Sequence, residues 1–283
     1  MSTAFVKVTG FTNMQVSMTQ RTFICPSRLF QRNFFFTFPA NHNYIVSFFT
    51  TFYYNKSMFT QNKCLVHYCR NLALSTFDKD GNISDDKNYC LDHIPDPGKF
   101  KEKIYKYIAE HDKIIGLNVS RLLFSNIDLS NKKFYGCTFT NCTFSNISSS
   151  NVLLRMCIFD FAIFNDCSFI KSNSLFTSFS GATFTHTLFT SSDIIQSNFN
   201  GIKAFQSSFD DSDLFSSRFI AATLTDTSFR NCNLKKSLFY DSKRSNVSFK
   251  MSNTREALFT PEGKAVSKHN LSFGNSIVDG DRV

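Results

Sequence analysis

The stretch CTFTNCTFSN, residues 137–146, contains the same five-residue pattern twice. Phe139 and Phe144 lie five residues apart, and each follows a cysteine by two residues. A helix repeats its buried positions every three to four residues and a strand every two, so a period of five fits neither. Such a period indicates an internal repeat, and the same pattern continues on both sides of this stretch.

Counted in steps of five from Phe124 to Phe259, the pattern runs without an insertion. Of its 28 large positions, 17 are Phe, five are Leu and one is Ile194; the exceptions are Ser149, Ser174, Ala204, Arg244 and Thr254. Two residues before these positions, 21 of 28 residues are Cys, Ser, Thr or Ala. We therefore expect each unit to turn one large and one small residue inward and to stack on its copies, because it cannot bury its apolar side alone.

A second period of 20 residues indicates a cross-section with four short sides. Every fourth large position from Phe139 onward is Phe, whereas the column that runs from Phe134 through Leu154, Ile194, Leu214 and Leu234 is mostly aliphatic. The predicted inward core contains Phe124, Phe139, Phe144, Phe159, Phe179, Phe199, Phe219, Phe239 and Phe259. The predicted small inward residues, where a reduced thiol acts as a small hydrophobe, include Cys137, Cys142, Cys157, Cys167 and Cys232.

These units resemble the pentapeptide-repeat family, whose units centre on Leu or Phe with a small residue two positions earlier. The resemblance implies an all-β solenoid, a right-handed quadrilateral parallel β-helix of about seven coils. The family usually favours Ala at the small position and Asp or Asn before it, whereas Ser and Cys dominate the small position here. The resemblance also implies that this chain can form a homodimer, as some family members do.

The segment before the repeats differs from them in charge. Residues 1–77 contain seven Lys or Arg and no acidic residue. Three interpretations stay open: the segment is a targeting signal (an address), a small folded domain, or upstream sequence wrongly included before Met58.

A helix is expected just before the repeats. Phe100, Ile104, Tyr107 and Ile108 would form one apolar face of a helix over 98–113, which would cap the open first coil. After residue 77 we therefore expect four segments: a loop or linker at 78–97, the capping helix and lead-in at 98–118, the β-helix at 119–260 and a C-terminal tail at 261–283.

Two groups of residues outside the repeats resemble metal sites. Asp78, Asp80 and Asn82 have the spacing of a calcium loop, but Ile83 and Tyr89 stand where Gly and a bidentate Glu are needed. An Asp80-Gly81 hairpin turn explains that stretch better. The second group offers zinc-type ligands at spacings that match no standard pattern, so we expect no metal there: Cys64, His67, Cys69, Cys90 and His93.

Catalytic motifs are absent from the sequence. The six histidines are scattered, and no phosphate-binding loop, HExxH or GxSxG motif occurs. The acidic residues of the coils fall on outward positions, where solubility and turn hydrogen bonds explain them. We therefore expect no enzyme activity, no catalytic residues and no cofactor.

The favoured function is a non-catalytic interaction scaffold with a protein partner. The sequence looks like the type III secreted effectors of the family, which implies a bacterial cytoplasmic protein secreted into a host cell and bound to a host protein. The alternative is a DNA mimic that binds gyrase or topoisomerase, which the coil charge of +4 disfavours because mimicry needs a negative rod. We expect no nucleic-acid partner, since the basic balance supplies only non-specific attraction. No apolar run is long enough for a membrane span.

Overall fold

The computed structural model describes residues 18–19, 22–23, 62–84 and 86–260. The chain forms two compact units, Met1–Lys56 and Ser57–Val283, and each is described by itself. In the first unit, β1 (Met18–Thr19) pairs antiparallel with β2 (Thr22–Phe23). The expected tail at 261–283 and most of the segment at 1–77 lie outside the described residues.

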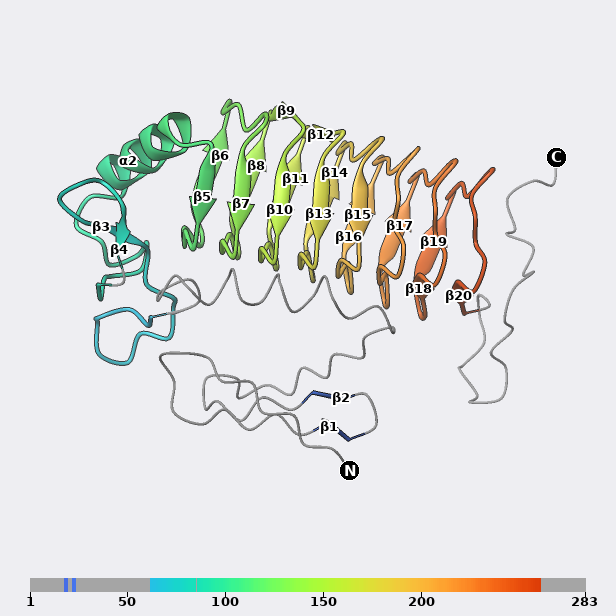
Figure 1. Cartoon of the computed structure of the whole chain (residues 1–283), viewed down its shortest axis with the longest axis horizontal. Helices are drawn as coiled ribbons and strands as arrows, with labels where there is room; N and C mark the ends of the chain where they lie inside the picture. Colours follow the sequence, from blue (N-terminus) through green and yellow to red (C-terminus); the bar gives the residue numbers. More distant parts are fainter. Residues whose placement is uncertain (1–17, 20–21, 24–61, 85, 261–283) are drawn as a thin grey trace. The chain divides into compact units, whose positions relative to one another are not determined.

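The second unit contains a stack of parallel coils (Figure 1). Each coil takes 20 residues, because the ladders pair residue i with residue i+20, as Phe124 pairs with Phe144. Strands and isolated bridges on four sides carry this pairing along the stack. The predicted all-β solenoid of about seven turns is thus confirmed.

Two sides of the coils carry long sheets. The seven-stranded sheet has the spatial order β19 (Lys243–Ser245), β17 (Thr223–Thr225), β16 (Lys203–Phe205), β14 (Thr183–Thr185), β11 (Ile163–Asn165), β8 (Thr143–Ser145) and β6 (Leu123–Ser125). The five-stranded sheet has the order β15 (Asp193–Ile195), β13 (Asn173–Leu175), β10 (Leu153–Arg155), β7 (Lys133–Tyr135) and β5 (Lys113–Ile115). The other sides hold the pairs β9 (Ser148–Ser150) with β12 (Ser168–Ile170), and β18 (Leu238–Phe239) with β20 (Leu258–Phe259).

A left-handed residue at each corner explains the period of five. The residue three positions before the large inward residue has a positive φ along the stack, for example 57° at Asn141 and 60° at Asp211. Asn, Asp and Gly adopt this conformation most readily, and they are frequent at these corners. Each unit is therefore one short side plus one turn, which neither a helix nor a flat strand provides.

Phenylalanine rings stack in columns inside the coils. From Phe139 to Phe259, the centroids of successive rings 20 residues apart lie 4.7–5.2 Å from one another. A second column lies on the seven-stranded side and contains Phe124, Phe144, Phe164 and Phe184. A third column lies on the next side and contains Phe169, Phe189, Phe209, Phe229 and Phe249. Where the seven-stranded side loses its rings, the smaller Ala204 and Leu224 are inward.

The small inward residues form hydrogen bonds between coils. The Oγ of Ser217 donates to the carbonyl of Ile194 at 2.7 Å, and the Sγ of Cys232 donates to the carbonyl of Phe209 at 3.0 Å. Both acceptors precede their donors by 23 residues, in the previous coil. The same Ser217 oxygen accepts the amide of Ser197 at 3.0 Å. This bonding gives a physical reason for Ser and Cys at a position where a small filler alone could be Ala.

Helix α2 (Pro97–Glu110) covers the start of the stack (Figure 1). Asp96 caps it by accepting the amide of Lys99 at 2.9 Å, and Phe100, Ile104 and Ile108 are buried in the cluster that contains the inward residues of the coils. The helix ends three residues earlier than expected, and β5 already pairs with β7. Residues 113–118, expected as a lead-in, therefore belong to the first coil.

The expected boundary between residues 77 and 78 falls inside a hairpin. Strand β3 (Thr76–Phe77) pairs antiparallel with β4 (Ile83–Ser84), and the predicted turn at Asp80-Gly81 connects them. Leu74 is buried, and the amide of Ser75 donates to the carbonyl of Asn118 in the first coil. The segment 62–77 is thus ordered together with 78–96, a correction to the expected division.

None of the described helices is long and apolar enough to cross a bilayer.

Candidate functional site

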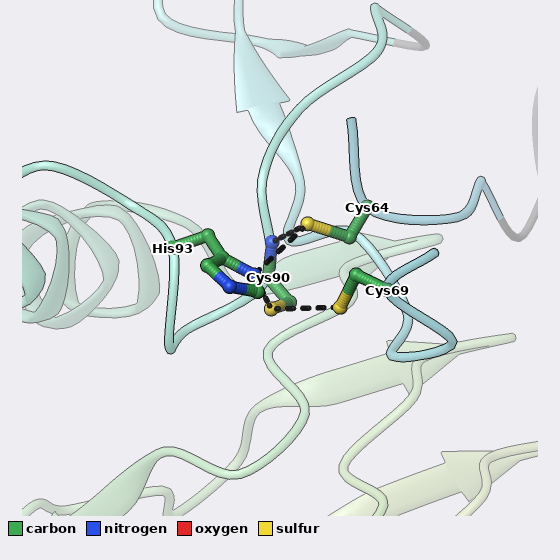
Figure 2. A group of neighbouring side chains, drawn as sticks. All are labelled: Cys64, Cys69, Cys90 and His93. Atoms are coloured by element: carbon green, nitrogen blue, oxygen red, sulfur yellow. Dashed lines mark hydrogen bonds between the residues drawn. The ribbon is translucent and has the colours of Figure 1, made fainter. Parts of the chain in front are cut away.

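Four of the five zinc-type candidates come together beside helix α2 (Figure 2). The Sγ atoms of Cys64, Cys69 and Cys90 and one ring nitrogen of His93 all lie within 4.8 Å of one another. His67 is not part of this group, and its ring packs edge-on against Tyr68. We call Cys64, Cys69, Cys90 and His93 the cysteine–histidine cluster.

A short hairpin supplies the first two cysteines. Lys63 forms an antiparallel bridge with Leu72, so the chain between them returns on itself. Cys69 donates its amide to the carbonyl of Val66, and Tyr68 has a φ of 67°, which completes a tight turn. This turn brings the side chain of Cys69 toward that of Cys64, although four residues separate the two.

A second turn supplies Cys90 and His93. The amides of His93 and Ile94 both donate to the carbonyl of Cys90, at 3.0 and 2.9 Å. The two arms are joined by backbone bonds, since the amide of Leu65 donates to the carbonyl of Asn88 at 3.0 Å. The backbone alone therefore holds the two ligand pairs opposite each other.

Hydrogen bonds to sulfur stabilise a thiolate in the cluster. The amide of Cys90 donates to the Sγ of Cys64 at 3.3 Å, and the side-chain amide of Asn71 approaches the Sγ of Cys90 at 3.8 Å. Burial alone would raise the pKa of the Cys64 thiol, but the amides of Cys90 and Val66 and the ring of His93 outweigh it and lower the pKa to about 6.

The sequence shows all four residues of the cluster, but it does not show that His67 lies outside it and that Cys64 pairs with Cys69. The structure uses Cys64 and Cys69 with four residues between them, a separation within the usual range for paired zinc cysteines. The CxxH pair of Cys90 and His93 is as expected from the sequence. The spacings of the four residues that come together therefore do not argue against a metal.

A second feature lies on the outer face of the seven-stranded sheet, here called the seven-stranded face. Each strand turns its middle residue inward and its first and third residues outward. The outward positions include many threonines, and their charged residues are Lys203 and Lys243. Large apolar side chains are exposed on it as well, namely Leu123, Ile163 and Phe205, with Phe161 at the adjoining corner.

His186 stands at the other edge of this face. Its Nδ1 lies 3.0 Å from a carboxylate oxygen of Asp166, and its Nε2 lies 2.8 Å from the side-chain oxygen of Gln206. Because both ring nitrogens face acceptors, the hydrogen bond to Asp166 and then that to Gln206 raise the pKa of His186. The three residues are 20 apart and form a ladder, so this is a structural feature of the corner.

The other residues predicted from the sequence lie in structural positions. The five coil cysteines are buried, and the predicted core phenylalanines are buried except Phe259, which is half-buried in the last coil. Asp211 and Asp213 accept the side-chain amides of Asn231 and Asn233 in the next coil. Arg244, a charge at an inward position, donates to the carbonyl of Thr260 and lies over the ring of Phe259.

Residues 182–259 match the sequence model of the family described as Pentapeptide repeat region. Among curated proteins, none matches this chain. Similar solved structures include QnrB1, a plasmid-mediated fluoroquinolone resistance protein, with 18% identity, 50% of this chain and 87% of that chain covered, and a TM-score of 0.31. Others are Rfr23 from the cyanobacterium Cyanothece 51142 (11% identity, 53% and 99% covered, TM-score 0.27) and HetL, involved in heterocyst differentiation regulation, from the cyanobacterium Nostoc sp. strain PCC 7120 (14% identity, 58% and 98% covered, TM-score 0.21).

Proposed function

Because this chain is a pentapeptide-repeat protein, we propose that it acts as a non-catalytic scaffold that binds another protein. The observation that carries this proposal is the seven-stranded face. Depletion of charge and enrichment in aromatic residues mark the centre of protein interfaces. Among the outward strand residues of this face, the only charges are Lys203 and Lys243, and Phe205 is an exposed aromatic residue; the strands follow one another along the stack (Figure 1).

The large apolar side chains of this face are exposed to solvent and could contact a partner protein. Phe161 is 60% exposed, Leu123 48% and Phe205 43%. The polar residues between them include Thr143, Thr183 and Thr185, whose methyl groups add apolar surface without charge. The parallel sheet also fixes the backbone of the strand residues Leu123 and Phe205, so binding need not order that backbone.

The interior of the coils offers no comparable site for a substrate. Its cavity is lined by Phe134, Phe159, Phe179 and other inward apolar residues, and it lies inside the stack. Active sites instead need polar groups that converge on an accessible cleft. This contrast favours a surface function over catalysis.

In its finer form, the proposal assigns the chain to bacterial effectors that are delivered into a host cell and bind a host protein there. The support is compositional. Residues 1–77 carry no acidic residue, and their first part, MSTAFVKVTGFTN, is rich in Ser and Thr. Segments of this composition occur among targeting peptides.

Affinity capture with two charge variants tests both forms of the proposal. Phe205→Asp places a charge on the seven-stranded face, and Leu188→Asp places one on another side at a residue with similar exposure, 40% against 43%. We expect the full-length chain to capture a protein from host lysate, and Phe205→Asp to weaken its binding by about tenfold or more, as for an interface anchor. Leu188→Asp should bind as the unmodified chain does.

Three other outcomes are informative. A partner captured from bacterial lysate alone would keep the scaffold and overturn the effector form. Equal loss with both variants, or with neither, would overturn the assignment to the seven-stranded face. Capture of gyrase or topoisomerase subunits would support the alternative function despite the positive coil charge.

A further inference from the structure

We propose that the cysteine–histidine cluster binds one zinc ion, with Cys64, Cys69 and Cys90 as thiolate ligands and His93 as an imidazole ligand through Nδ1. The ion would join the two arms of the segment 62–96 and so hold this segment on the first coil. The proposal concerns stability and does not depend on the scaffold function.

Three of the six distances within the cluster are close to the edges of a zinc tetrahedron, and the other three are at most 4.8 Å. With Zn–S bonds of about 2.3 Å and a Zn–N bond of about 2.0 Å, tetrahedral geometry places two sulfurs about 3.8 Å apart and a sulfur about 3.5 Å from the nitrogen. The Sγ atoms of Cys69 and Cys90 lie 3.8 Å apart. The Nδ1 of His93 lies 3.5 Å from the Sγ of Cys64 and 3.3 Å from that of Cys90.

The donor set selects zinc over harder cations. Three thiolates and one imidazole are soft to borderline ligands, whereas magnesium and calcium require oxygen. Four protein ligands also leave no open position, which is the arrangement of structural rather than catalytic zinc.

The surroundings of the cluster supply hydrogen bonds that a zinc-bound sulfur needs. Three thiolates on one Zn²⁺ leave a net negative charge, and N–H donors aimed at the sulfurs offset it. The amide of Cys90 points at the Sγ of Cys64, and the side chain of Asn71 points at the Sγ of Cys90. Asn71 is itself held by Asp92 at 3.0 Å, which also pairs with Arg121 of the first coil.

A zinc ion would stabilise a segment whose own core is small. Between residues 62 and 96, the buried apolar residues are Cys64, Ala73, Leu74 and Cys90, and two of these are cluster members. A core of this size supplies little stability, and structural zinc commonly replaces one in small domains. Residues 73–75 follow the first arm and are bonded to the first coil, because the side chain of Asn118 donates to the carbonyl of Ala73 at 2.6 Å and its backbone amide donates to the Oγ of Ser75 at 2.8 Å. Fixing the arms would therefore also strengthen the attachment of this segment to the first coil.

Metal analysis of the purified full-length chain tests the proposal, with ligand variants and matched controls. We expect about one zinc per chain, and less than about a tenth of that in Cys90→Ser and His93→Ala. Cys232→Ser is the cysteine control, because Ser212 at the equivalent position of the preceding coil already makes the same bond, to the carbonyl of Phe189 at 2.8 Å. His67→Ala is the histidine control, and both controls should keep the zinc.

Cobalt exchange keeps the test decisive if the ligand variants fail to fold. Replacing zinc by Co²⁺ in the unmodified chain should give intense visible absorption and thiolate charge-transfer bands that saturate at one equivalent. Removal of the metal by a chelator should speed proteolysis within 62–96 and leave 113–260 resistant. A chain purified without zinc and with Cys69 joined to Cys90 as a disulfide, a weak octahedral cobalt spectrum, or full zinc in His93→Ala would overturn the proposal.

Discussion

Replacing Phe199 by alanine is expected to lower the free energy of unfolding of the coils by roughly 3–5 kcal/mol, as for fully buried aromatic residues. The ring of Phe199 is buried, and its centroid lies 4.9 Å from that of Phe179 and 4.8 Å from that of Phe219. Phe209 contacts it edge-on at 5.5 Å. Truncation would leave a void between stacked coils that the backbone pairing prevents from collapsing.

Urea unfolding followed by circular dichroism measures this effect, with Phe205→Ala as the matched control. Phe205 is 43% exposed on the seven-stranded face, so its truncation should cost less than about 1 kcal/mol. If the two variants unfolded at the same urea concentration, the inward column would not stabilise the stack as described.

Replacing Ser217 by leucine is expected to cost roughly 2–6 kcal/mol. The larger side chain overfills a fully buried position, which costs about 1–3 kcal/mol. It also removes the acceptor of the Ser197 amide and the donor to the carbonyl of Ile194, and a buried unsatisfied polar group costs about 1–3 kcal/mol more.

The control for this prediction is Ser217→Cys, measured by the same unfolding experiment. Cys232 occupies the equivalent position three five-residue units later and donates to a backbone carbonyl in the same way. We therefore expect the cysteine variant to stay within about 1 kcal/mol of the unmodified chain. A leucine variant as stable as the cysteine variant would contradict the need for a small polar residue at this position.

The coils could be predicted from the sequence because their structure is local and repeated. The positions of Phe139 and Phe144 specify a unit of five residues, and the unbroken Phe column specifies four units per coil. The hydrogen bonds of Ser217 and Cys232 could not be predicted in the same way. They join residues 23 apart, and a serine at a small position does not reveal whether its hydroxyl has an acceptor.

The cysteine–histidine cluster could be predicted only in part, because its geometry depends on tertiary contacts. The sequence shows the residues, but the turn at Tyr68 and the bond from Leu65 to Asn88 decide which of them meet. The same contacts order the segment 62–77 with the hairpin that follows. Its lack of acidic residues leaves three interpretations of residues 1–77 open, because composition carries no information on such contacts.

Labelling of the coil cysteines tests the inward packing of the five-residue units most directly. The full-length chain is treated with an alkylating reagent at pH 8, with and without denaturant, and the modified peptides are identified by mass spectrometry. Burial raises the pKa of Cys142 and of Cys232 to about 12, so little reactive thiolate forms at these positions in the folded chain. We expect no modification in the native chain and full modification in denaturant at Cys137, Cys142, Cys157, Cys167 and Cys232, which are at most 2% exposed. Rapid modification of these cysteines in the native chain would contradict the inward arrangement of the repeats.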